Sequence, residues 1–275
     1  MQSIQNSKEI KVVKIGGNIV GNIVDSPEAL TSFLLDFQKL EGKKILVHGG
    51  GVMASKMAID LELKTTMIEG RRVTDAETLK LVTMVYAGWI NKNIVALLQK
   101  EGCNAIGLSG ADANCVPATK RSTFPVDYGF VGDTAPNMVN TTFINNLLDK
   151  DIVPVFCAIT HDEKGTLLNT NADTVAYTIS VALSHIAKTS LYYCFEKEGV
   201  LKDVENSDKI FSSLTKEQYQ VYKDQNIIAG GMIPKLHNSF NAIDEGVSKV
   251  FILHAKNILN EKGTKLISSD ETVTK

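Results

Sequence analysis

The feature that most constrains the fold of this chain is a regular alternation of short β-rich runs with longer helical patterns. The first run, Ile10–Ile15, ends in Gly16-Gly17. A predicted helix then opens at Ser26-Pro27, with a cap residue and a proline at its first position, and closes at Gly42. This rhythm is typical of parallel strands joined by crossover helices, so the sequence predicts an α/β protein with an open, mainly parallel sheet.

The same rhythm continues along the rest of the chain. Residues 43–47 form a predicted strand that runs into glycines at 49–51, and the spacing of Thr74 and Glu77 predicts a capping box for a helix that reaches Gly102. Residues 109–140 lose periodicity and favour hairpins or a lid. The later predicted strands are residues 104–108, 152–159, 191–195 and 247–253. The later predicted helices are residues 141–149, 215–225 and 232–245, and Gly246 ends the last of them. A further helix is predicted from Asp173, with an apolar face that would bury Val175, Ile179, Ala182, Leu183 and Ile186.

Composition excludes several classes of protein. The chain has 29 basic and 31 acidic residues and a net charge of −2, which favours neither nucleic acid nor an anionic membrane as a partner. Its longest apolar run, residues 152–159, is far shorter than the roughly 20 residues that span a bilayer. The first residues lack the apolar stretch of a signal peptide. Four cysteines without metal-site spacing predict buried free thiols, so we expect a cytoplasmic protein.

Glycine turns at the ends of two strands predict a site for an anion. The Gly16-Gly17 pair and the three glycines at 49–51 fall where an open parallel sheet forms its ligand crevice, and bare backbone amides there can cradle a phosphate or carboxylate. Lys14 lies inside an apolar strand next to the first turn, where an ammonium group needs an anion. A third glycine turn, residues 230–231, leads to Lys235 at the opening of a helix.

Each of these features also has a plain structural explanation. The glycines could serve tight turns only, Lys14 could be a solvated edge-strand lysine, and the segment 169–173 could do no more than cap a helix. Arg71-Arg72 could be surface charge. Residues 49–54 also fit the short dinucleotide pattern GxGxxA, with Glu69 near the distance of a ribose-binding acid, so an NAD(P)-dependent oxidoreductase is an alternative.

Five motifs occur in chain order along the sequence. They are VVKIGG at 12–17, VHGGG at 47–51, GRRVT at 70–74, NTNADT at 169–174 and GGMIPK at 230–235. With these motifs the chain resembles the acetylglutamate kinases of the amino acid kinase family. The resemblance implies a three-layer αβα sandwich with two lobes that share the sheet: residues 1–184 would bind an N-acylated glutamate and form a dimer, and residues 185–275 would bind the nucleotide.

The resemblance also implies a role for each matching residue. Lys14 and Lys235 would stabilise the transferring phosphoryl group, and Asp173 would hold the two ammonium groups in place. Gly50 and Gly51 would contact the reacting end of the substrate, and Arg72 and Asn169 would bind its α-carboxylate and acylamino group. The residues that would contact the nucleotide and its phosphates are Gly16, Gly17, Glu196, Gly199 and Gly231.

The reaction implied is transfer of the ATP γ-phosphoryl group to the side-chain carboxylate of the substrate, a step of arginine biosynthesis. Magnesium would be held mainly by the nucleotide phosphates, so we expect no protein metal ligand. Two departures from the family pattern, Ala111 and the segment 194–200, leave N-succinylglutamate as an alternative acceptor, with Lys120, Arg121 and Arg71 as candidate cations. A catalytically idle regulatory module is a more distant alternative.

Only nine residues precede Ile10, whereas arginine-inhibited members of the family carry a long amino-terminal helix. We therefore expect a homodimer, formed through the long helix near Thr74 and without arginine feedback.

Overall fold

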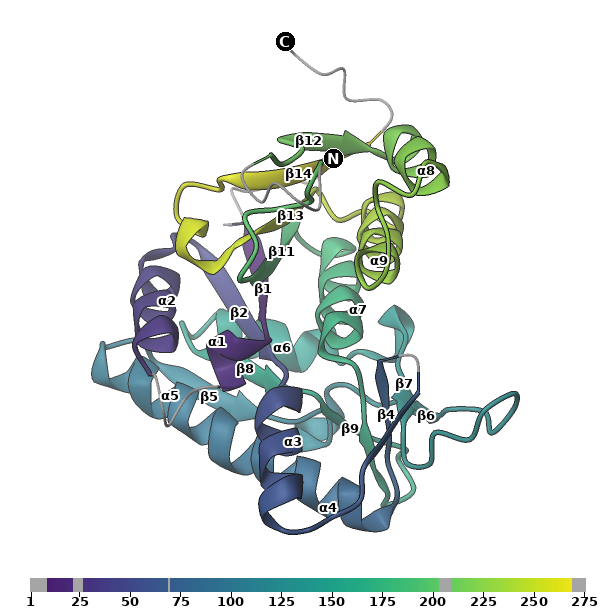
Figure 1. Ribbon diagram of the computed structural model, residues 1–275. Helices are drawn as coiled ribbons and strands as arrows, with labels where there is room; N and C mark the ends of the chain where they lie inside the picture. Colours follow the sequence, from purple (N-terminus) through teal and green to yellow (C-terminus); the bar gives the residue numbers. More distant parts are fainter. Residues whose placement is uncertain (1–8, 22–26, 69, 203–208, 269–275) are drawn as a thin grey trace.

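The computed structural model describes residues 9–21, 27–68, 70–202 and 209–268. Eight strands form its central sheet in the order β12-β14-β13-β11-β1-β2-β8-β5, in which only β13 and β14 run antiparallel to each other (Figure 1). The strands are β12 (Ser213–Thr215), β14 (Gly263–Ile267), β13 (Lys249–His254), β11 (Thr189–Phe195), β1 (Ile10–Ile15), β2 (Lys43–His48), β8 (Val153–Cys157) and β5 (Ala105–Leu108).

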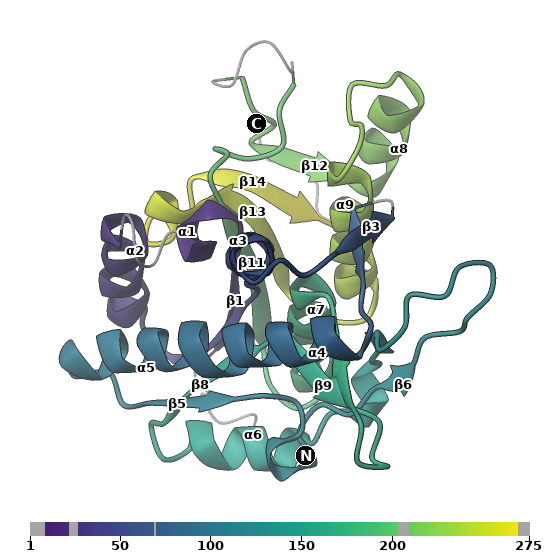
Figure 2. The ribbon, with the colours of Figure 1, turned by 60° about the horizontal axis from the view of Figure 1, so that its bottom comes forward.

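Helices cover both faces of this sheet, which confirms the predicted αβα sandwich. The helices α2 (Glu28–Lys39) and α5 (Asn91–Lys100) lie on one face, and α6 (Thr141–Leu148), α7 (Ala172–Ser184) and α9 (Met232–Asp244) lie on the other (Figures 1 and 2). Buried strand residues read as nearly continuous apolar runs, as two covered faces require. The remaining helices are α1 (Asn18–Gly21), α3 (Gly51–Asp60), α4 (Ala76–Thr83) and α8 (Lys216–Asp224), with a π-helical segment η1 (Met84–Ile90) and the 3₁₀ turns η2 (Asp112–Asn114), η3 (Pro136–Met138) and η4 (Ala255–Asn257).

Three small antiparallel pairs project from the carboxyl end of the sheet. They are β3 (Thr66–Ile68) with β4 (Arg71–Val73), β6 (Thr119–Lys120) with β7 (Gly132–Asp133), and β9 (Ile159–His161) with β10 (Leu167–Asn169). The second pair occupies the aperiodic stretch 109–140, as predicted.

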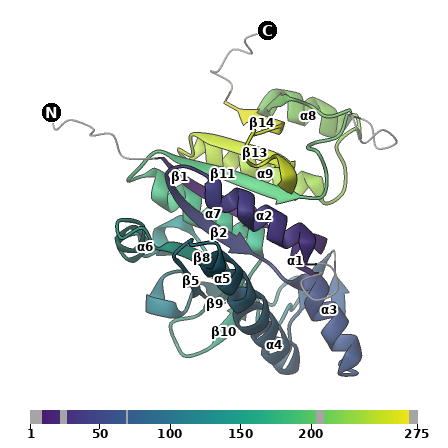
Figure 3. The ribbon, with the colours of Figure 1, turned by 90° about the vertical axis from the view of Figure 1, so that its left-hand side faces the viewer.

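The sheet itself divides at β1. Its β1-β2-β8-β5 half comes from residues before 185, and its β11-β13-β14-β12 half comes from residues after 185 (Figure 3). The assignment of separate binding lobes to 1–184 and 185–275 stays a prediction. Because the chain leaves β1 through α2 on one face and enters β11 through α7 on the other, the crevice of the sheet lies at the carboxyl ends of β1 and β11.

Several local predictions need correction. The helix α4 begins one residue later than the capping box requires: the Asp75 carboxylate accepts from Thr78 N, while the Thr74 hydroxyl donates to Arg72 O. Pro27 occupies the cap position of α2 rather than its first helical position, and Ser26 is outside the described residues. Ile186 follows the end of α7 and is 54% exposed, because the helix stops at Ser184 before this residue can join the buried face.

The helix predicted from Thr74 is continuous over Ala76–Lys100. Among the described residues it is the one helix long and apolar enough to cross a bilayer by length and composition alone. Buried residues along it, such as Val85, Ile94 and Leu98, contribute to the core, as in a core helix of a globular domain. All four cysteines are buried and free, as predicted.

Candidate active site

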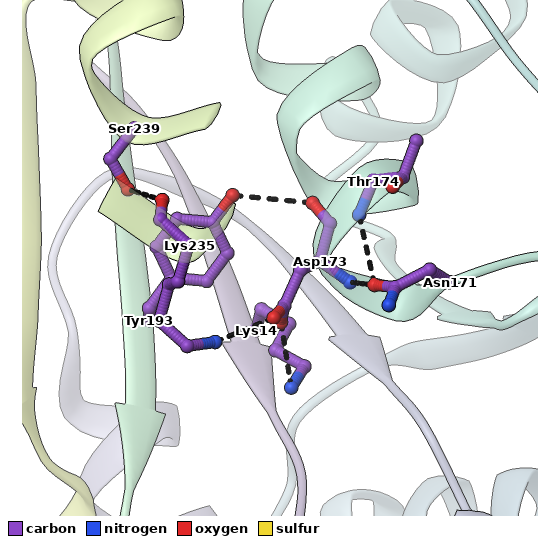
Figure 4. Close-up of polar contacts among 7 residues, drawn as sticks. All are labelled: Lys14, Asn171, Asp173, Thr174, Tyr193, Lys235 and Ser239. Atoms are coloured by element: carbon purple, nitrogen blue, oxygen red, sulfur yellow. Dashed lines mark hydrogen bonds and ion pairs between the residues drawn. The ribbon is translucent and has the colours of Figure 1, made fainter. Parts of the chain in front are cut away.

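The site is built around one carboxylate held between two lysines. Asp173 Oδ1 lies 2.8 Å from Lys14 Nζ, and Asp173 Oδ2 lies 2.5 Å from Lys235 Nζ (Figure 4). Lys14 comes from β1, Asp173 from the first turn of α7 and Lys235 from the first turn of α9. Three residues far apart in the sequence therefore meet at the carboxyl ends of the central strands.

Backbone and aromatic contacts hold this cluster in place. The Asn171 side chain caps α7 by accepting from the backbone amides of Asp173 and Thr174, and the Tyr193 hydroxyl donates to Asp173 O at 3.2 Å. Lys235 Nζ lies 4.9 Å from the centre of the Tyr193 ring and 5.8 Å from that of Phe195. These two ring faces replace part of the water that the ammonium group has lost.

The charges in the cluster are strongly coupled. Burial would raise the pKa of the Asp173 carboxyl, but the ammonium groups of Lys14 and Lys235 outweigh burial and hold this pKa below its usual range. Burial lowers the pKa of Lys235, and the Asp173 carboxylate offsets part of that effect. Two ammonium groups and one carboxylate leave one positive charge in excess, so the cluster favours a further anion.

The first glycine turn lies directly beside Lys14. Gly17 adopts a φ of +64°, which favours glycine, and a Cβ atom on Gly16 would stand 2.5 Å from Lys14 Nζ, so the turn lies against the ammonium group of this lysine. The Glu196 side chain reaches this turn from the end of β11 and accepts from Asn18 N at 2.6 Å. The structure thus brings three of the residues predicted for nucleotide binding, Gly16, Gly17 and Glu196, into one place.

The second glycine turn, which is formed by residues 49–51, faces Arg72 of β4. Arg72 Nη2 donates to Gly51 O at 3.2 Å and to Ser55 Oγ at 2.7 Å, whereas Arg72 Nη1 is buried and has no hydrogen-bond partner. Asn169 belongs to the same patch through Thr74, because Asn169 Nδ2 donates to Thr74 Oγ1, which donates to Arg72 O. A buried guanidinium nitrogen without an acceptor is suited to a carboxylate ligand.

Comparison with known proteins assigns this arrangement to a family. A model of the amino acid kinase family matches residues 9–254. The chain belongs to the amino acid kinase family. It is 50% identical to the acetylglutamate kinase of Cytophaga hutchinsonii over 269 residues, which cover 95% of this chain and 100% of that protein. It is 49% identical to the acetylglutamate kinase of Phocaeicola vulgatus over 257 residues, which cover 94% of this chain and 98% of that protein.

Solved structures support the same fold. The structure of smu.665 from Streptococcus mutans matches with a TM-score of 0.76 and 27% identity, covering 94% of this chain and 98% of that one. Carbamate kinase from Giardia lamblia, at 11% identity, matches with a TM-score of 0.70 and covers 96% of this chain and 100% of that one, which is a likeness of fold alone.

Membership in this family gives no support to the interpretation of residues 49–54 as a dinucleotide-binding pattern. Side-chain packing explains why this pattern has a glycine at position 50. A Cβ atom on Gly50 would stand 2.4 Å from Tyr86 Cδ1 and 2.7 Å from Ile90 Cδ1. Glu69, the acid proposed for a ribose, is outside the described residues.

The remaining residues predicted to contact the nucleotide or a succinyl group lie outside these two clusters. Gly199 is buried, and a Cβ atom there would stand 2.7 Å from Thr264 Oγ1, so strand packing alone requires this glycine. Gly231 precedes α9 with open space around it. Arg121, a candidate cation for a succinyl group, already forms an ion pair with Asp133, and Lys120 lies over the Phe130 ring.

Sequence reasoning missed the residues that support the cluster from other elements. Tyr193 and Phe195 lie on β11 two residues apart, a spacing that puts both on one face of the sheet. Only the packing of α9 beside β11 shows that both rings meet Lys235. In the described part of the chain, no group of three or more His, Cys, Asp or Glu side chains could hold a metal ion.

Proposed function

We propose that this chain phosphorylates the side-chain carboxylate of N-acetyl-L-glutamate, using ATP as the donor. The single observation that carries the proposal is the Lys14–Asp173–Lys235 cluster, which offers an excess positive charge where the crevice of the sheet opens. Relatives about half identical over nearly the whole chain are acetylglutamate kinases, which supports the same acceptor.

The chemistry needs charge compensation more than proton transfer. A carboxylate with a pKa of about 4.3 is already ionised at neutral pH, so its oxygen can attack the γ-phosphorus without a general base. The new carboxyl oxygen–phosphorus bond forms as the bond to the bridging oxygen of ADP breaks, and ADP leaves with that electron pair. Lys14 and Lys235 would offset the negative charge that spreads over the phosphoryl oxygens, and Asp173 would keep the two ammonium groups in position.

We propose that magnesium is held mainly by the nucleotide phosphates. The Asp173 carboxylate is shared by two lysines, and the Glu196 carboxylate is occupied by Asn18 N, so neither is arranged as a dedicated ligand. When bound, the ion would supply further positive charge to the phosphoryl oxygens.

The acceptor would lie between the second glycine turn and the β3–β4 pair. The Arg72 guanidinium would bind the α-carboxylate through its unpartnered Nη1, and Asn169 would contact the acylamino group. The amides of Gly50 and Gly51 would meet the reacting carboxylate. On the other side of the cluster, the turn Gly16-Gly17 would bind phosphates, and Glu196, Gly199 and Gly231 would border the nucleotide.

We further propose that the enzyme is a homodimer built on the long helix Ala76–Lys100. Met84 and Trp89 are 57% and 50% exposed on this helix, and together with Met53, Met57 and Val85 they line a hollow of about 570 Å³. Such an exposed apolar surface favours a partner. Light scattering should give two subunits for the native chain and one for Trp89→Glu, and a monomeric native chain would exclude this interface.

A cytoplasmic location is part of the same proposal. Four buried free thiols fit a reducing compartment.

An acceptor assay tests the proposed reaction. The purified chain is incubated with ATP, magnesium and either N-acetyl-, N-succinyl- or free glutamate, and the acyl phosphate is trapped with hydroxylamine. We expect the hydroxamate to form with N-acetyl-L-glutamate at the highest kcat/KM. Absence of product with every acceptor would contradict the proposed function, and a preference for the succinyl compound would correct the acyl group.

A further inference from the structure

His48 is a fully buried histidine at the end of β2, directly before the second glycine turn. Its Nδ1 atom lies 2.8 Å from Gly49 O, and its Nε2 atom lies 3.0 Å from Nδ2 of Asn91, the first residue of α5. The Asn91 side chain is buried as well and donates to Val155 O of β8 at 2.9 Å. The imidazole ring is therefore held between the glycine turn and the long helix.

The groups around this ring determine where its proton lies. Gly49 O and Val155 O are carbonyl oxygens, which only accept hydrogen bonds. Val155 O therefore faces the amide nitrogen of Asn91, and the second hydrogen of that nitrogen points to His48 Nε2. Burial lowers the pKa of His48 to about 4, so at neutral pH the ring is neutral and has one hydrogen. That hydrogen lies on Nδ1, where it is donated to Gly49 O.

The hydrogen bond to Gly49 O fixes the direction of the next amide. Gly49 C=O and Gly50 N–H belong to one planar trans peptide unit, so the two groups point in opposite directions. Because the carbonyl is turned to the buried ring, Gly50 N–H points away from that ring. Gly50 is the cap residue of α3, so its amide is among those with no partner within the helix. This amide can therefore donate to a ligand.

The long helix restricts the same peptide unit. Its π-helical segment η1 brings Tyr86 and Ile90 so close to Gly50 that a Cβ atom there would stand 2.4 Å from the ring of Tyr86 and 2.7 Å from Ile90 Cδ1. Such segments frequently occur at functional sites. In this close packing, the hydrogen bond from His48 selects one of two opposite orientations of the peptide. The other orientation would turn Gly50 N–H toward the ring and Gly49 O away from it.

We propose that His48 is a positioning residue for phosphoryl transfer, which holds the Gly49–Gly50 peptide so that Gly50 N–H faces the reacting carboxylate of the acceptor. Asn91 keeps the ring in the tautomer that donates to Gly49 O. The opposite orientation of the peptide would present a carbonyl oxygen to the carboxylate and repel it. This proposal rests on the proposed function, because it assumes that the reacting carboxylate of the acceptor lies at Gly50.

Two substitutions of His48 separate its two hydrogen bonds. The amide nitrogen of asparagine is as many bonds from Cβ as Nδ1 of histidine, so His48→Asn can keep the bond to Gly49 O. The amide group of glutamine is as many bonds from Cβ as Nε2, so His48→Gln can keep the contact with Asn91 but loses the bond to Gly49 O. We expect His48→Gln to lower kcat with N-acetyl-L-glutamate by about 10- to 100-fold, as for a misplaced donor to the transition state. His48→Asn should keep kcat within about threefold of the native value, and KM for both substrates should change by less than about threefold in either variant.

His237→Gln is the matched control, because His237 Nε2 also lies close to an asparagine amide, 3.3 Å from Asn241 Nδ2, but at an exposed position of α9. His237 follows Lys235 by two residues, which places it about 200° around the helix from this lysine. The control should keep native kcat. Equal losses of kcat in His48→Asn and His48→Gln, or no loss in His48→Gln, would overturn the role of His48.

Nitrogen-15 spectra of the histidine rings give a readout that does not depend on turnover. At neutral pH the native chain should show one ring with a proton on Nδ1 and a bare Nε2, and this signal should be absent from both His48 variants. A proton on Nε2 of His48 would overturn the proposal even if neither variant folds. A native chain that shows the expected tautomer but phosphorylates no acceptor would instead contradict the proposed function.

Discussion

Replacing Asp173 by asparagine tests the charge balance of the whole site. The change keeps the shape of the side chain and removes the one negative charge between two ammonium groups that lie 2.8 and 2.5 Å from its oxygens. Removing one partner of a fully buried ion pair costs about 3–5 kcal/mol. The three side chains here keep 14–21% exposure, so we expect a loss near the lower end, about 3 kcal/mol.

Thermal unfolding measures this loss. At roughly 2–4 °C per kcal/mol for a chain of this size, Asp173→Asn should lower Tm by about 6–12 °C. A non-hydrolysable ATP analogue should reduce the difference from the native chain, because its phosphates supply the missing negative charge. Asp244→Asn is the control, because it breaks the ion pair between Asp244 and Lys216, two side chains that are each 52% exposed. Such an exposed pair contributes at most about 1 kcal/mol to the free energy of unfolding.

The pH dependence of turnover gives a second measurement. Lys235 must carry its proton to stabilise the phosphoryl group, so kcat falls as the pH rises through the pKa of Lys235. Burial lowers the pKa of Lys235, and the Asp173 carboxylate raises it. Removing this carboxylate in Asp173→Asn should therefore lower the pKa of Lys235 further and move the alkaline limb of the kcat profile to lower pH. We expect kcat at neutral pH to fall about 10²-fold, as for one lost donor to the transition state. An unchanged limb together with an unchanged Tm would refute the coupling of Asp173 to the lysines.

Three further predictions use the same structure. Lys235→Ala should lower kcat by about 10²–10³-fold with little change in KM, whereas Lys216→Ala on the surface should leave both unchanged; near-normal turnover of the first variant would remove Lys235 from the mechanism. Arg72→Ala should raise KM for N-acetyl-L-glutamate and leave KM for ATP unchanged in steady-state kinetics, and a dominant loss of kcat would contradict a binding role. Gly50→Ala should cost about 1–3 kcal/mol in urea unfolding because its Cβ meets a packed ring at 2.4 Å, while Gly51→Ala, with open space at that position, should cost much less; equal costs would contradict this packing.

The sequence predicted most elements because their signals are local. Alternating strand and helix patterns, glycines at strand ends and the polar start of α7 are readable within a few residues, and the structure has these elements close to the predicted bounds. The errors are local as well. At the start of α4, two adjacent residues can both cap a helix, and the choice of Asp75 over Thr74 depends on the β4 backbone that holds the Thr74 hydroxyl.

The residues to which we assign phosphoryl transfer could be singled out from the sequence, because Lys14, Asp173 and Lys235 lie in short motifs of their own. Their roles remain predictions, but the structure brings the three side chains into direct contact. What the motifs could not reveal is the set of residues that support them. Tyr193 meets Lys235 only because the first turn of α9 lies beside β11, and Tyr86 meets Gly50 only because the long helix crosses the second glycine turn.

The sequence by itself thus determined the order and kind of the longer helices and of six strands of the central sheet, together with the identity of the charged groups, since these follow from side-chain spacing along the chain. It did not predict the edge strands β12 and β14 or the pair β3–β4, and it gave residues 152–159 as one strand where the structure has β8 and the start of β9. Only the tertiary structure decided which groups share a carboxylate, which guanidinium nitrogen is left without an acceptor and which aromatic rings line the site. These properties depend on contacts between residues far apart in the chain, such as Lys14 and Asp173, which are 159 positions apart, and strand order and helix packing set those contacts.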